Sequence, residues 1–463
     1  MDRIHLEQAA TRLTADTETP IGLCLKHPNA LLLESAEVDG RMGRYSVLGT
    51  DFILRLDCDK GRLAVTTFDN RLAPLETFSG MDYLEGLRRV LDALEIVPPD
   101  GFGELPPITR ALYGYLGYGI TGLCVERLAK SLKPEAAEAC LVLPGRLFLF
   151  DHLYDRLTEL RLSNYQAPVA EPENREPRLT GPVESHPTRE GFLRIVENIK
   201  EALKAGEGIQ VVPSVHFQAP FEGNPLTLYR RLRRCNASPY LFYLPLPELT
   251  LLGSSPELNI RCQANNLQLS PIAGTRKRGQ TDEADAALAA ELLQDPKERA
   301  EHLMLVDLGR NDVGRIARPG SVKVERLMEV ERFSHVMHLT SRVTGRLKPG
   351  LDPVDVIKAT FPAGTVSGAP KVRAMEIIAE QEARPRGPYA GCIGWIGLDH
   401  QSVSLDLGIT IRSLWIRNQT INWQAGAGIV FDSIPEKEFA ECCNKSAIIR
   451  DVISGEPHVP AHR

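Results

Sequence analysis

The sequence predicts an α+β fold in which most of the sheets are antiparallel. Segments with the pattern of β-strands follow one another in runs, and Asp-Gly and Lys-Gly turns separate several of them. Segments with the pattern of amphipathic helices stand between these runs and do not alternate strictly with single strands. Because parallel sheets arise from strict alternation of strand and helix, this order favours antiparallel pairing.

Residues 1–163 are expected to form a β-rich N-terminal domain. Residues 30–70 hold short apolar runs separated by turns, and a helix pattern follows at residues 81–95. Residues 164–187 contain many Pro, Glu and Asn residues and few apolar ones, a composition that cannot bury a core. We therefore interpret 164–187 as a linker or a surface excursion.

Residues 188–455 are expected to form the second domain. A helix is predicted over 188–206, because apolar residues from Phe192 to Leu203 recur at helical spacing. The other predicted elements are strands at 208–219, 240–245, 249–262 and 267–275, helices at 282–317 and 367–383, a hairpin formed by 401–418 and 420–432, and a last helix.

Composition narrows the class of protein. The chain has 463 residues, of which 43% are hydrophobic and 25% charged, as in soluble globular proteins with two or three domains. A formal net charge of −6 argues against nucleic acid or an acidic membrane as a partner, because both are met by basic surfaces. No apolar run approaches the roughly 18 residues of a membrane span, and the N-terminal residues lack a signal-peptide core. The nine cysteines show no C-x-x-C spacing, so we expect reduced thiols in a cytoplasmic protein.

Two pairs of glutamates are the clearest candidate for a metal site. Glu298 and Glu301 lie in KERAEHLMLVDLGRND, and Glu438 and Glu441 lie in DSIPEKEFAECCNK. The members of each pair are three residues apart, so on a helix both carboxylates lie on the same face. Two such helices facing each other could hold Mg²⁺, which prefers a few carboxylates and keeps room for water and an anionic ligand.

Helix capping is the main alternative for these glutamates. Asp295 is expected to be an N-cap followed by Pro296, which makes Glu298 the N3 residue of its helix. In the last helix Ser433 is expected to cap and Glu436 to take the N3 position, so capping does not explain the second pair. Solvated helix faces are a further alternative for all four carboxylates.

Three other segments carry candidate anion-binding or polar residues. QAGAGIV at 424–430 marks either tight packing or a backbone amide surface for a carboxylate, and FPAGTVSGAPKVRAMEII at 361–378 opens a helix whose N–H groups favour anions. Arg412, on the polar side of the predicted strand LDLGITIRS, could clamp a carboxylate with both arms, although a surface arginine fits the same pattern. His335 and His338 fall on a predicted strand, where positions three apart face opposite sides, which disfavours a shared metal ligand role.

Taken together, these segments resemble the chorismate-utilising enzymes, most closely the large subunit (component I) family of anthranilate synthases. The resemblance covers nearly the whole chain and is strongest from 205 to 450. Six motifs occur in the family's order: PIAGTRKRG, EHLMLVDLGRND, RFSHVMHLTSRVTG, GTVSGAPKVRAMEII, RGPYAGCIGW and QAGAGIVFDSIPEKE. The resemblance implies the chorismate-binding enzyme fold, with antiparallel sheets packed together, surrounding helices and a β-rich N-terminal regulatory part.

The resemblance also implies a reaction and a set of site residues. Ammonia adds at C2 of chorismate while the C4 hydroxyl leaves; pyruvate is then eliminated and the aromatic product is anthranilate. Mg²⁺ is the implied cofactor, with Glu301 and Glu441 as direct ligands and Glu298 and Glu438 acting through water. The implied catalytic residues are Glu257, the general acid for the departing hydroxyl, His338, which assists pyruvate elimination, and Thr275. The implied substrate-binding residues are Gly274, Thr275, Thr365, Tyr389, Arg412, Gly426, Ala427, Gly428 and Lys445.

Two positions favour anthranilate synthase over its relatives. Aminodeoxychorismate synthases commonly have a lysine nucleophile where this chain has Ala273, and without that amine a covalent attack at C2 is unavailable. Isochorismate and salicylate synthases use a lysine as a base for water where this chain has Gln210. An aminodeoxychorismate synthase of the folate pathway is nevertheless an alternative, because some of these enzymes share the pattern at Ala273. A catalytically silent tryptophan-sensing or partner-binding protein is a third.

Regulation and partners are further implications of the resemblance. The family binds L-tryptophan, its feedback inhibitor, through residues that here are Glu34, Ser35, Asn236, Pro239, Tyr240, Leu241 and Gly253. No glutaminase is fused to the chain: IGLCLKHP around Cys24 lacks the second glycine and the helix start of a glutaminase nucleophile turn. A separate glutaminase subunit (component II) is therefore expected to supply ammonia.

Overall fold

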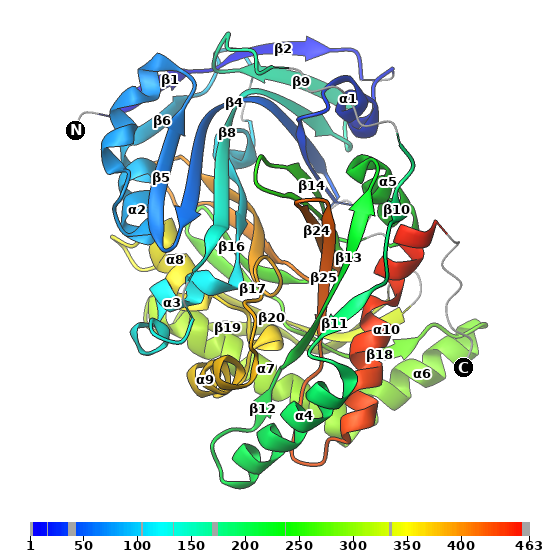
Figure 1. Cartoon of the computed structure of the whole chain (residues 1–463). Coiled ribbons are helices and arrows are strands. Elements are labelled where there is room, and N and C mark those ends of the chain that lie inside the picture. Colours follow the sequence, from blue (N-terminus) through cyan, green and yellow to red (C-terminus); the bar gives the residue numbers. More distant parts are fainter. Residues whose placement is uncertain are drawn as a thin grey trace.

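One continuous network of antiparallel strand pairs runs through most of the chain (Figure 1). The structure, a computed structural model, describes residues 3–15, 17–35, 43–102, 105–132, 134–168, 175–236, 238–332 and 336–455. Within these ranges 21 strands belong to the large sheet, and its paired strands are antiparallel. The parallel pair β1–β6 stands outside it. The prediction of an α+β fold with mostly antiparallel sheets is confirmed.

The strands are β1 Ile4–Glu7, β2 Ala9–Leu13, β3 Leu31–Glu34, β4 Tyr45–Asp59, β5 Arg62–Thr67, β6 Leu94–Val97, β7 Ala111–Leu116, β8 Ala136–Asp151, β9 Arg156–Arg161, β10 Arg178–Leu179, β11 Glu184–His186, β12 Gln210–Val211, β13 Ser214–Glu222, β14 Tyr240–Pro245, β15 Thr250–Ser255, β16 Leu258–Gln263, β17 Asn266–Leu269, β18 Ile272–Lys277, β19 Lys323–Arg332, β20 Val336–Arg346, β21 Gly368–Ala369, β22 Cys392–Gly397, β23 Leu405–Ile409, β24 Ser413–Arg417 and β25 Thr420–Gly426. The α-helices are α1 Pro20–Lys26, α2 Tyr83–Ala93, α3 Thr121–Cys124, α4 Arg189–Lys204, α5 Pro225–Cys235, α6 Asp282–Gln294, α7 Pro296–Ile316, α8 Pro353–Thr360, α9 Lys371–Gln381 and α10 Pro435–Ser454.

Two strand pairs join the N-terminal part of the chain to the C-terminal part. Strand β3 pairs with β14, with Glu34 opposite Leu241, and β7 pairs with β22, with Gly114 opposite Gly394. Strands β10 and β11, from the segment 164–187, both pair with β13. The N-terminal strands and the C-terminal strands are therefore parts of the same sheet.

Side-chain caps begin the helices that position the site. Thr188 accepts a hydrogen bond from the Gly191 amide at 3.2 Å at the start of α4. Asp295 accepts from the Lys297 and Glu298 amides at 3.0 and 3.2 Å at the start of α7. Such caps satisfy backbone donors that have no partner within the helix. The predicted cap at Asp295 is confirmed, and Asp295 also divides the predicted helix 282–317 into α6 and α7.

Three local predictions are wrong. Ser433 does not cap α10, because its hydroxyl accepts from the Val430 amide at 3.0 Å in the preceding turn, and the cap position falls on Ile434. Arg412 does not lie on a strand, since β23 ends at Ile409 and Arg412 sits in the turn before β24 with a φ of 48°. The helix predicted at 367–383 begins only at Lys371, because the preceding residues pair with β12 as β21.

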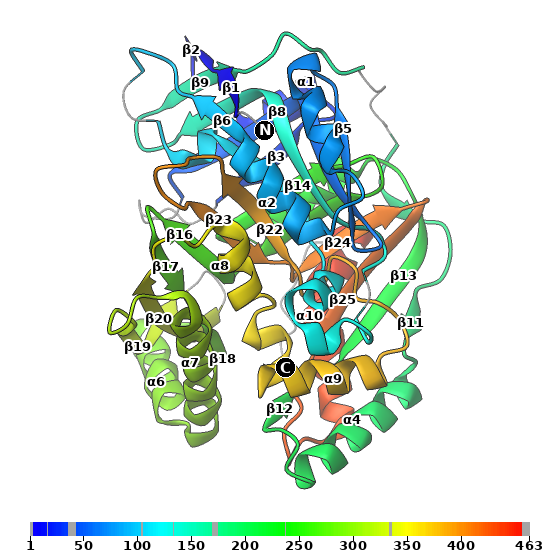
Figure 2. The ribbon, with the colours of Figure 1, turned by 90° about the vertical axis from the view of Figure 1, so that its left-hand side faces the viewer.

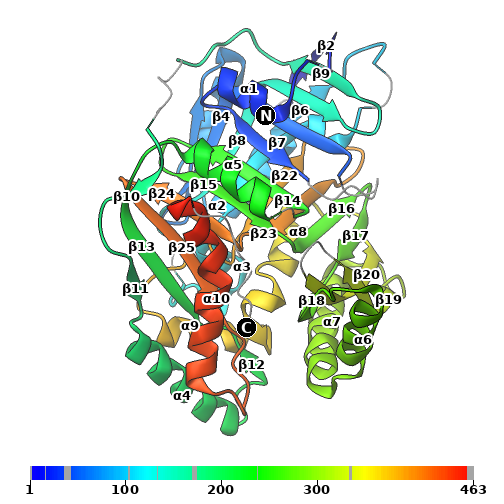
Figure 3. The same ribbon diagram turned by 90° about the vertical axis from the view of Figure 1, so that its right-hand side faces the viewer.

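Two groups of helices lie beside the sheet (Figures 2 and 3). Helix α10 packs against β25 and against both α4 and α5, and α5 packs against β14 and β15. Phe192, Ile199, Leu228, Trp423 and Ile449 from these elements belong to one buried apolar cluster. Helices α6 and α7 lie with β17–β20 in a lobe that stands apart from α9 and α10 in both views. Among the described residues no helix is long and apolar enough to cross a membrane. All nine cysteines are free thiols.

Candidate active site

Glu257 is a buried carboxyl in the two-residue connection between β15 and β16. Only 7% of it is exposed, and its backbone carbonyl accepts from the Ile409 amide at 2.9 Å, which fixes this corner against β23. Burial raises the pKa of Glu257 to about 7, while Thr365 and Arg412 partly oppose this rise. A carboxyl that is half protonated near neutral pH can donate a proton to a leaving group.

Arg412 places a positive charge in the same interior. Its backbone is in the left-handed region, φ 48°, which is uncommon for a residue other than glycine. The Arg412 carbonyl accepts from the Ser254 amide at 3.1 Å, which holds the turn against β15. Burial lowers the pKa of Arg412, whereas the neighbouring Glu257 raises it. A buried guanidinium of this kind can bind a carboxylate with two parallel hydrogen bonds.

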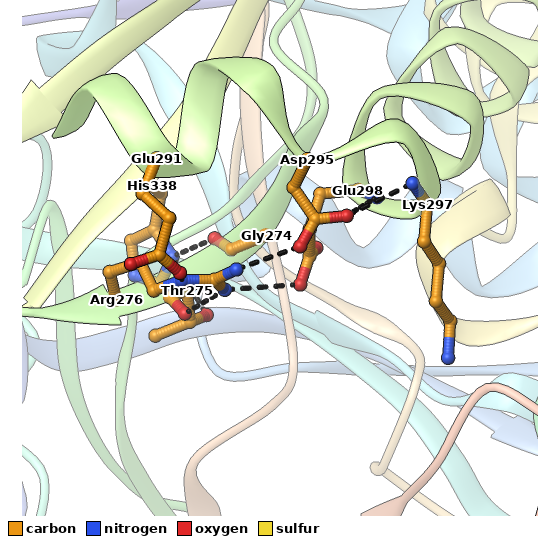
Figure 4. Close-up of polar contacts among 8 residues, drawn as sticks. All are labelled: Gly274, Thr275, Arg276, Glu291, Asp295, Lys297, Glu298 and His338. Atoms are coloured by element: carbon orange, nitrogen blue, oxygen red, sulfur yellow. Dashed lines mark hydrogen bonds and ion pairs between the residues drawn. The ribbon is translucent and has the colours of Figure 1, made fainter. Parts of the chain in front are cut away.

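His338 and Thr275 face each other across β18 and β20 (Figure 4). The His338 Nδ1 atom lies 2.8 Å from the Gly274 carbonyl and 3.1 Å from the Thr275 hydroxyl. Because a carbonyl can only accept, Nδ1 carries the proton and the lone pair of the neutral ring is on Nε2. Burial lowers the pKa of His338, so the neutral form is favoured near pH 7. His335 lies outside the described residues.

The α7 glutamates are each held by a polar side chain. Glu298 lies beside Gly274, since a Cβ atom on Gly274 would be 3.0 Å from Glu298 Oε2, and it accepts from Arg276 at 3.3 Å. Glu301 accepts from the Gln210 side-chain amide at 2.9 Å. Burial, and then the like charge of Glu301, raise the pKa of Glu298 against the effect of Arg276.

The α10 glutamates are linked to a lysine and to the glycine-rich segment. Lys445 Nζ lies 2.7 Å from Glu441 Oε1 and donates to the Gly426 carbonyl at 3.1 Å. Burial raises the pKa of Glu438, and Glu441 adds to the rise. Ser433 and then Lys297 of α7 act in the opposite direction on the pKa of Glu438.

These four carboxylates have the donor chemistry that Mg²⁺ prefers, because all are hard oxygen ligands on two separate helices. They form two like-charged pairs, each partly compensated by one cation, Arg276 or Lys445. Among the residues that the structure describes, no three acidic, His or Cys side chains lie close enough together to hold a metal ion. The four carboxylates are ligands of the chemical type that Mg²⁺ prefers. For both pairs to bind one Mg²⁺ ion directly, the two pairs must lie closer to each other than they do in this structure.

The glycines of QAGAGIV leave space for neighbouring side chains. A Cβ atom on Gly426 would lie 2.8 Å from the Tyr389 hydroxyl, and one on Gly428 would lie 2.6 Å from Gln210 Nε2. The Ala427 amide already donates to the Pro213 carbonyl at 3.2 Å. Tyr389 and Gln210 can therefore approach this backbone closely because the side chains are absent.

The structure thus connects the candidate catalytic, metal and substrate-binding residues into one region. Glu301 contacts Gln210, which packs against Gly428; Lys445 joins Glu441 to Gly426. Thr365 lies beside Glu257 and its buried hydroxyl has no regular hydrogen bond among the described residues.

The candidate tryptophan residues gather where β3, β14 and β15 meet. Glu34 is opposite Leu241 in the sheet and accepts from Tyr229 at 2.7 Å and from Arg233 at 2.9 and 3.0 Å. The hydroxyl of Ser35 is buried without a hydrogen-bond partner among the described residues.

The other candidate tryptophan-binding residues also lie in or beside β14 and β15. The Asn236 amide donates to Ser254, and the Tyr240 hydroxyl donates to Asp406 at 2.7 Å. Pro239 directly precedes β14. A Cβ atom on Gly253 would collide with Phe242, so this position requires glycine.

Two site residues have no counterpart among the sequence predictions. Arg276 donates to Glu298, to Asp295 at 2.8 Å and to Glu291 at 3.0 Å, and therefore ties β18 to the end of α6 and the start of α7 (Figure 4). Its only sequence signal is its place directly after Thr275 in PIAGTRKRG. Lys297, whose side chain points away from this network in Figure 4, carries no pattern that sets it apart from a surface lysine.

Comparison with known proteins shows the family to which the chain belongs. The model of the chorismate binding enzyme family matches residues 57–451. The chain is 40% identical to anthranilate synthase component 1 of Aquifex aeolicus, with 96% of this chain and 94% of that protein covered. It is 38% identical to anthranilate synthase component 1 of Bacillus subtilis, with 97% and 92% covered.

Solved structures agree in fold. The crystal structure of anthranilate synthase component I from Streptococcus pneumoniae has a TM-score of 0.73 at 32% identity, with 88% of this chain and 92% of that chain covered. MenF, the menaquinone-specific isochorismate synthase of Escherichia coli, has a TM-score of 0.73 at 19% identity, with 98% and 96% covered, and shows the fold alone. The chain belongs to the chorismate binding enzymes and, among them, to the anthranilate synthase component 1 family.

Proposed function

We propose that this chain converts chorismate and ammonia to anthranilate, pyruvate and water, as the lyase subunit of an anthranilate synthase. The observation that carries the proposal is Glu257, a buried carboxyl with a pKa of about 7 that lies next to Thr365 and Arg412. The reaction needs a proton donor for a poor leaving group beside a site for an anionic substrate, and this group of residues can provide both. The identity to relatives named anthranilate synthase component 1 supports the same activity.

In the first step Glu257 donates its proton to the C4 hydroxyl of chorismate. The C–N bond forms at C2, the two ring double bonds shift to C1=C6 and C4=C5, the C4–O bond breaks, and water leaves. The bound nitrogen then releases one proton, which balances the proton that Glu257 gave. The elevated pKa of Glu257 keeps a large protonated fraction near pH 7, which this role requires.

In the second step His338 accepts the proton from C2. Its neutral ring carries the lone pair on Nε2, because Nδ1 donates to the Gly274 carbonyl at 2.8 Å. The electrons of the C–H bond complete the aromatic ring while the C3–O bond breaks. The departing enolate takes up a proton at its methylene carbon and becomes pyruvate.

Substrate binding uses the remaining residues of the region. Arg412 and Tyr389 bind the enolpyruvyl carboxylate beside the Gly426 and Gly428 amides, and Gly274, Thr275 and Thr365 contact the ring. Lys445 places a positive charge near the ring carboxylate. Mg²⁺, when held by Glu301 and Glu441 directly and by Glu298 and Glu438 through water, supplies charge screening for that carboxylate.

The residues at two positions indicate which nucleophile attacks the ring. Gln210 cannot deprotonate water, and Ala273 on β18 has no amine for a covalent attack, so free ammonia is the attacking species. A separate glutaminase subunit, component II, delivers this ammonia in the cell, in the cytoplasm.

L-Tryptophan inhibits the enzyme by binding at the junction of β3 and β14. The support is the gathering of Glu34, Leu241 and Tyr240 at this junction together with the unpartnered hydroxyl of Ser35. Because β3 comes from the N-terminal part and β14 from the C-terminal part, a ligand here changes activity if it binds one arrangement of the two parts better than the other.

Product identification tests the proposed function. Purified chain is incubated with chorismate, an ammonium salt and Mg²⁺, and the products are followed by fluorescence and mass spectrometry. We expect anthranilate and pyruvate in equal amounts with ammonium, and no turnover when glutamine is the only nitrogen source.

Three other outcomes would contradict parts of this account. Aminodeoxychorismate formed without pyruvate would identify the folate-pathway enzyme. Absence of any turnover, with tryptophan binding retained, would indicate a silent sensor. Glutamine-dependent turnover by the isolated chain would contradict a separate glutaminase subunit.

A further inference from the structure

A buried arginine lies directly behind the candidate substrate-binding surface and has no role in the proposed reaction. Arg386 is in the connection between α9 and β22, three residues before Tyr389, and is 2% exposed. Its guanidinium forms a two-pronged ion pair with Glu382, with Nε–Oε2 and Nη2–Oε1 distances of 2.8 Å. Such a planar fork fixes the orientation of both side chains.

The same guanidinium also holds two backbone segments of the site. Its Nη1 atom donates to the Val366 carbonyl at 2.9 Å, and Nη2 donates to the Val212 carbonyl at 2.6 Å. Val366 directly follows Thr365 in the turn η5, Gly364–Val366. Val212 comes two residues after Gln210. Arg386 therefore connects two loops that are distant in sequence and that both carry candidate site residues.

Arg386 also positions an aromatic ring of the site. Its Cζ atom lies 4.6 Å from the ring centroid of Tyr118 and 5.7 Å from that of Tyr389. Its carbonyl accepts from the Tyr389 amide at 3.2 Å. A cation at this distance from a ring face is attracted to it, so the Tyr389 ring is held by both the backbone and the side chain of Arg386.

Glu382 extends the network to the glycine-rich strand. Its Oε1 atom accepts from the Ser214 amide at 2.9 Å and from the Ser214 hydroxyl at 2.8 Å, and the Gln424 side chain donates to that hydroxyl at 2.7 Å. Ser214 is opposite Gly426 in the β13–β25 pair. The pair Arg386–Glu382 thus reaches all the segments that carry Thr365, Tyr389 and Gly426.

We propose that Arg386 is a positioning residue that aligns Thr365, Tyr389 and Gly426 into one binding surface for the substrate carboxylate. The inference rests on the proposed function, because it assigns this surface to chorismate. A buried ion pair is not needed for stability alone, since an apolar pair of similar volume is often as stable. An arginine at this position has the planar set of donors needed to reach a carboxylate and two carbonyls at once, which a lysine lacks.

The main test is Arg386→Lys, which keeps the charge beside Glu382 and loses the fork. We expect the KM for chorismate to rise about 10-fold and kcat to fall about 10-fold, because small misplacement of binding groups affects substrate and transition state. The KM for ammonium should stay within about twofold. A merely structural role predicts a different result, since loss of folded molecules lowers the apparent kcat and leaves both KM values unchanged.

A double variant keeps the test decisive if the single change impairs folding. Glu382→Leu with Arg386→Met removes the charged pair without leaving one charge buried and unpaired, so a folded protein is expected. It lacks the bonds to Val366 and Val212, and we expect the same rise in the KM for chorismate. A folded double variant with the wild-type KM would overturn the inference.

Arg44→Lys is the matched control. Arg44 also forms a two-pronged pair, with Asp151 at 3.1 and 2.9 Å, and its Cζ atom lies 4.8 and 5.1 Å from the rings of Tyr45 and Tyr154, but these residues lie in the N-terminal part of the chain, at the ends of β4 and β8 and in the turn after β8. Its kinetic constants should match those of the wild type. A wild type that does not convert chorismate would overturn the proposed function, whereas an active wild type with unchanged Arg386→Lys kinetics would overturn only this inference.

Discussion

The side-chain amide of Gln210 donates to the Glu301 carboxylate at 2.9 Å and so connects β12 to α7. Gln210 is buried and packs against Gly428, where a side chain would collide with its Nε2 atom. One amide therefore lies between a candidate metal ligand and the glycine-rich backbone that is proposed to bind the substrate. A carboxylate ligand held in this way keeps one orientation, and partners of this kind commonly tune metal affinity.

Removing the Gln210 side-chain amide should raise the Mg²⁺ concentration that the enzyme needs for activity. In Gln210→Ala we expect the Mg²⁺ concentration for half-maximal anthranilate formation to rise about 10- to 100-fold, because Glu301 loses its orienting donor. Initial rates over a Mg²⁺ series measure this. Gln218→Ala is the control, since Gln218 makes the same type of bond to Glu184 at 2.9 Å on an exposed part of β13. Equal Mg²⁺ curves for both variants would contradict the role of Gln210.

The pH dependence of turnover should follow Glu257. Its pKa of about 7 means that the protonated, proton-donating form is lost as the pH rises through 7. We expect kcat/KM for chorismate to fall above pH 7, and Glu257→Gln to lose about 100- to 10,000-fold in rate while remaining folded. Rates are measured with the concentration of free ammonia held constant at each pH. A Glu257→Gln variant with appreciable activity would exclude this proton donor.

Stability should depend on pH through Glu138. Burial raises the pKa of this carboxyl to about 8, although the Gly119 amide donates to it at 2.7 Å. Between its ordinary pKa of 4.5 and 8 the folded chain binds more protons at this group than the unfolded chain, so its contribution to stability falls as the pH rises. The full shift corresponds to about 5 kcal/mol in the free energy of unfolding.

Glu138→Gln should remove this contribution without changing catalysis. We expect denaturant unfolding to give similar stability for the variant and the wild type at pH 5, and higher stability for the variant at pH 8.5. Equal pH slopes for the two proteins would show that Glu138 ionises as it does in the unfolded chain.

Tryptophan inhibition should depend on Glu34. Its buried carboxylate, held by Tyr229 and Arg233, is the acidic group at the β3–β14 junction that is proposed to meet the ligand's ammonium group. Glu34→Gln should raise the tryptophan concentration for half inhibition at least about 10-fold, because a charge-assisted bond is lost. Glu159→Gln is the control, as the Glu159 carboxylate likewise accepts hydrogen bonds from two side chains, those of Arg146 and Arg161. If calorimetry detects no heat of binding at millimolar tryptophan, the proposal of a tryptophan site is wrong.

Local sequence signals predicted much of the fold. The helical spacing from Phe192 to Leu203 and the run Asp295-Pro296 gave correct helices, because periodicity and capping act within a few residues. The predicted cap at Ser433 was wrong, because the serine hydroxyl accepts its hydrogen bond within the preceding turn and not from the helix. A short-range sequence signal does not distinguish between these two partners.

The long-range contacts of the site could not be read from the sequence alone. Arg386 and Val212 are 174 positions apart, and nothing near either residue indicates their bond. Arg412 looked like a strand residue because apolar residues alternate before it, but strand β23 ends at Ile409 and the chain turns through a left-handed conformation that the arginine itself does not favour. Motif order identified the candidate residues, whereas the partners that hold them came from the structure.

The most direct test of the central claim is the Mg²⁺ dependence of anthranilate formation by the wild type, Glu301→Gln, Glu441→Gln and Asp307→Asn. Asp307 is the control, an exposed carboxylate of α7 paired with Arg310 at 2.7 Å. We expect Mg²⁺-dependent anthranilate release by the wild type and Asp307→Asn, and a loss of about 100-fold or more in each glutamate variant with the fold intact. Full activity in both glutamate variants, or anthranilate formation that needs no Mg²⁺, would contradict the central claim.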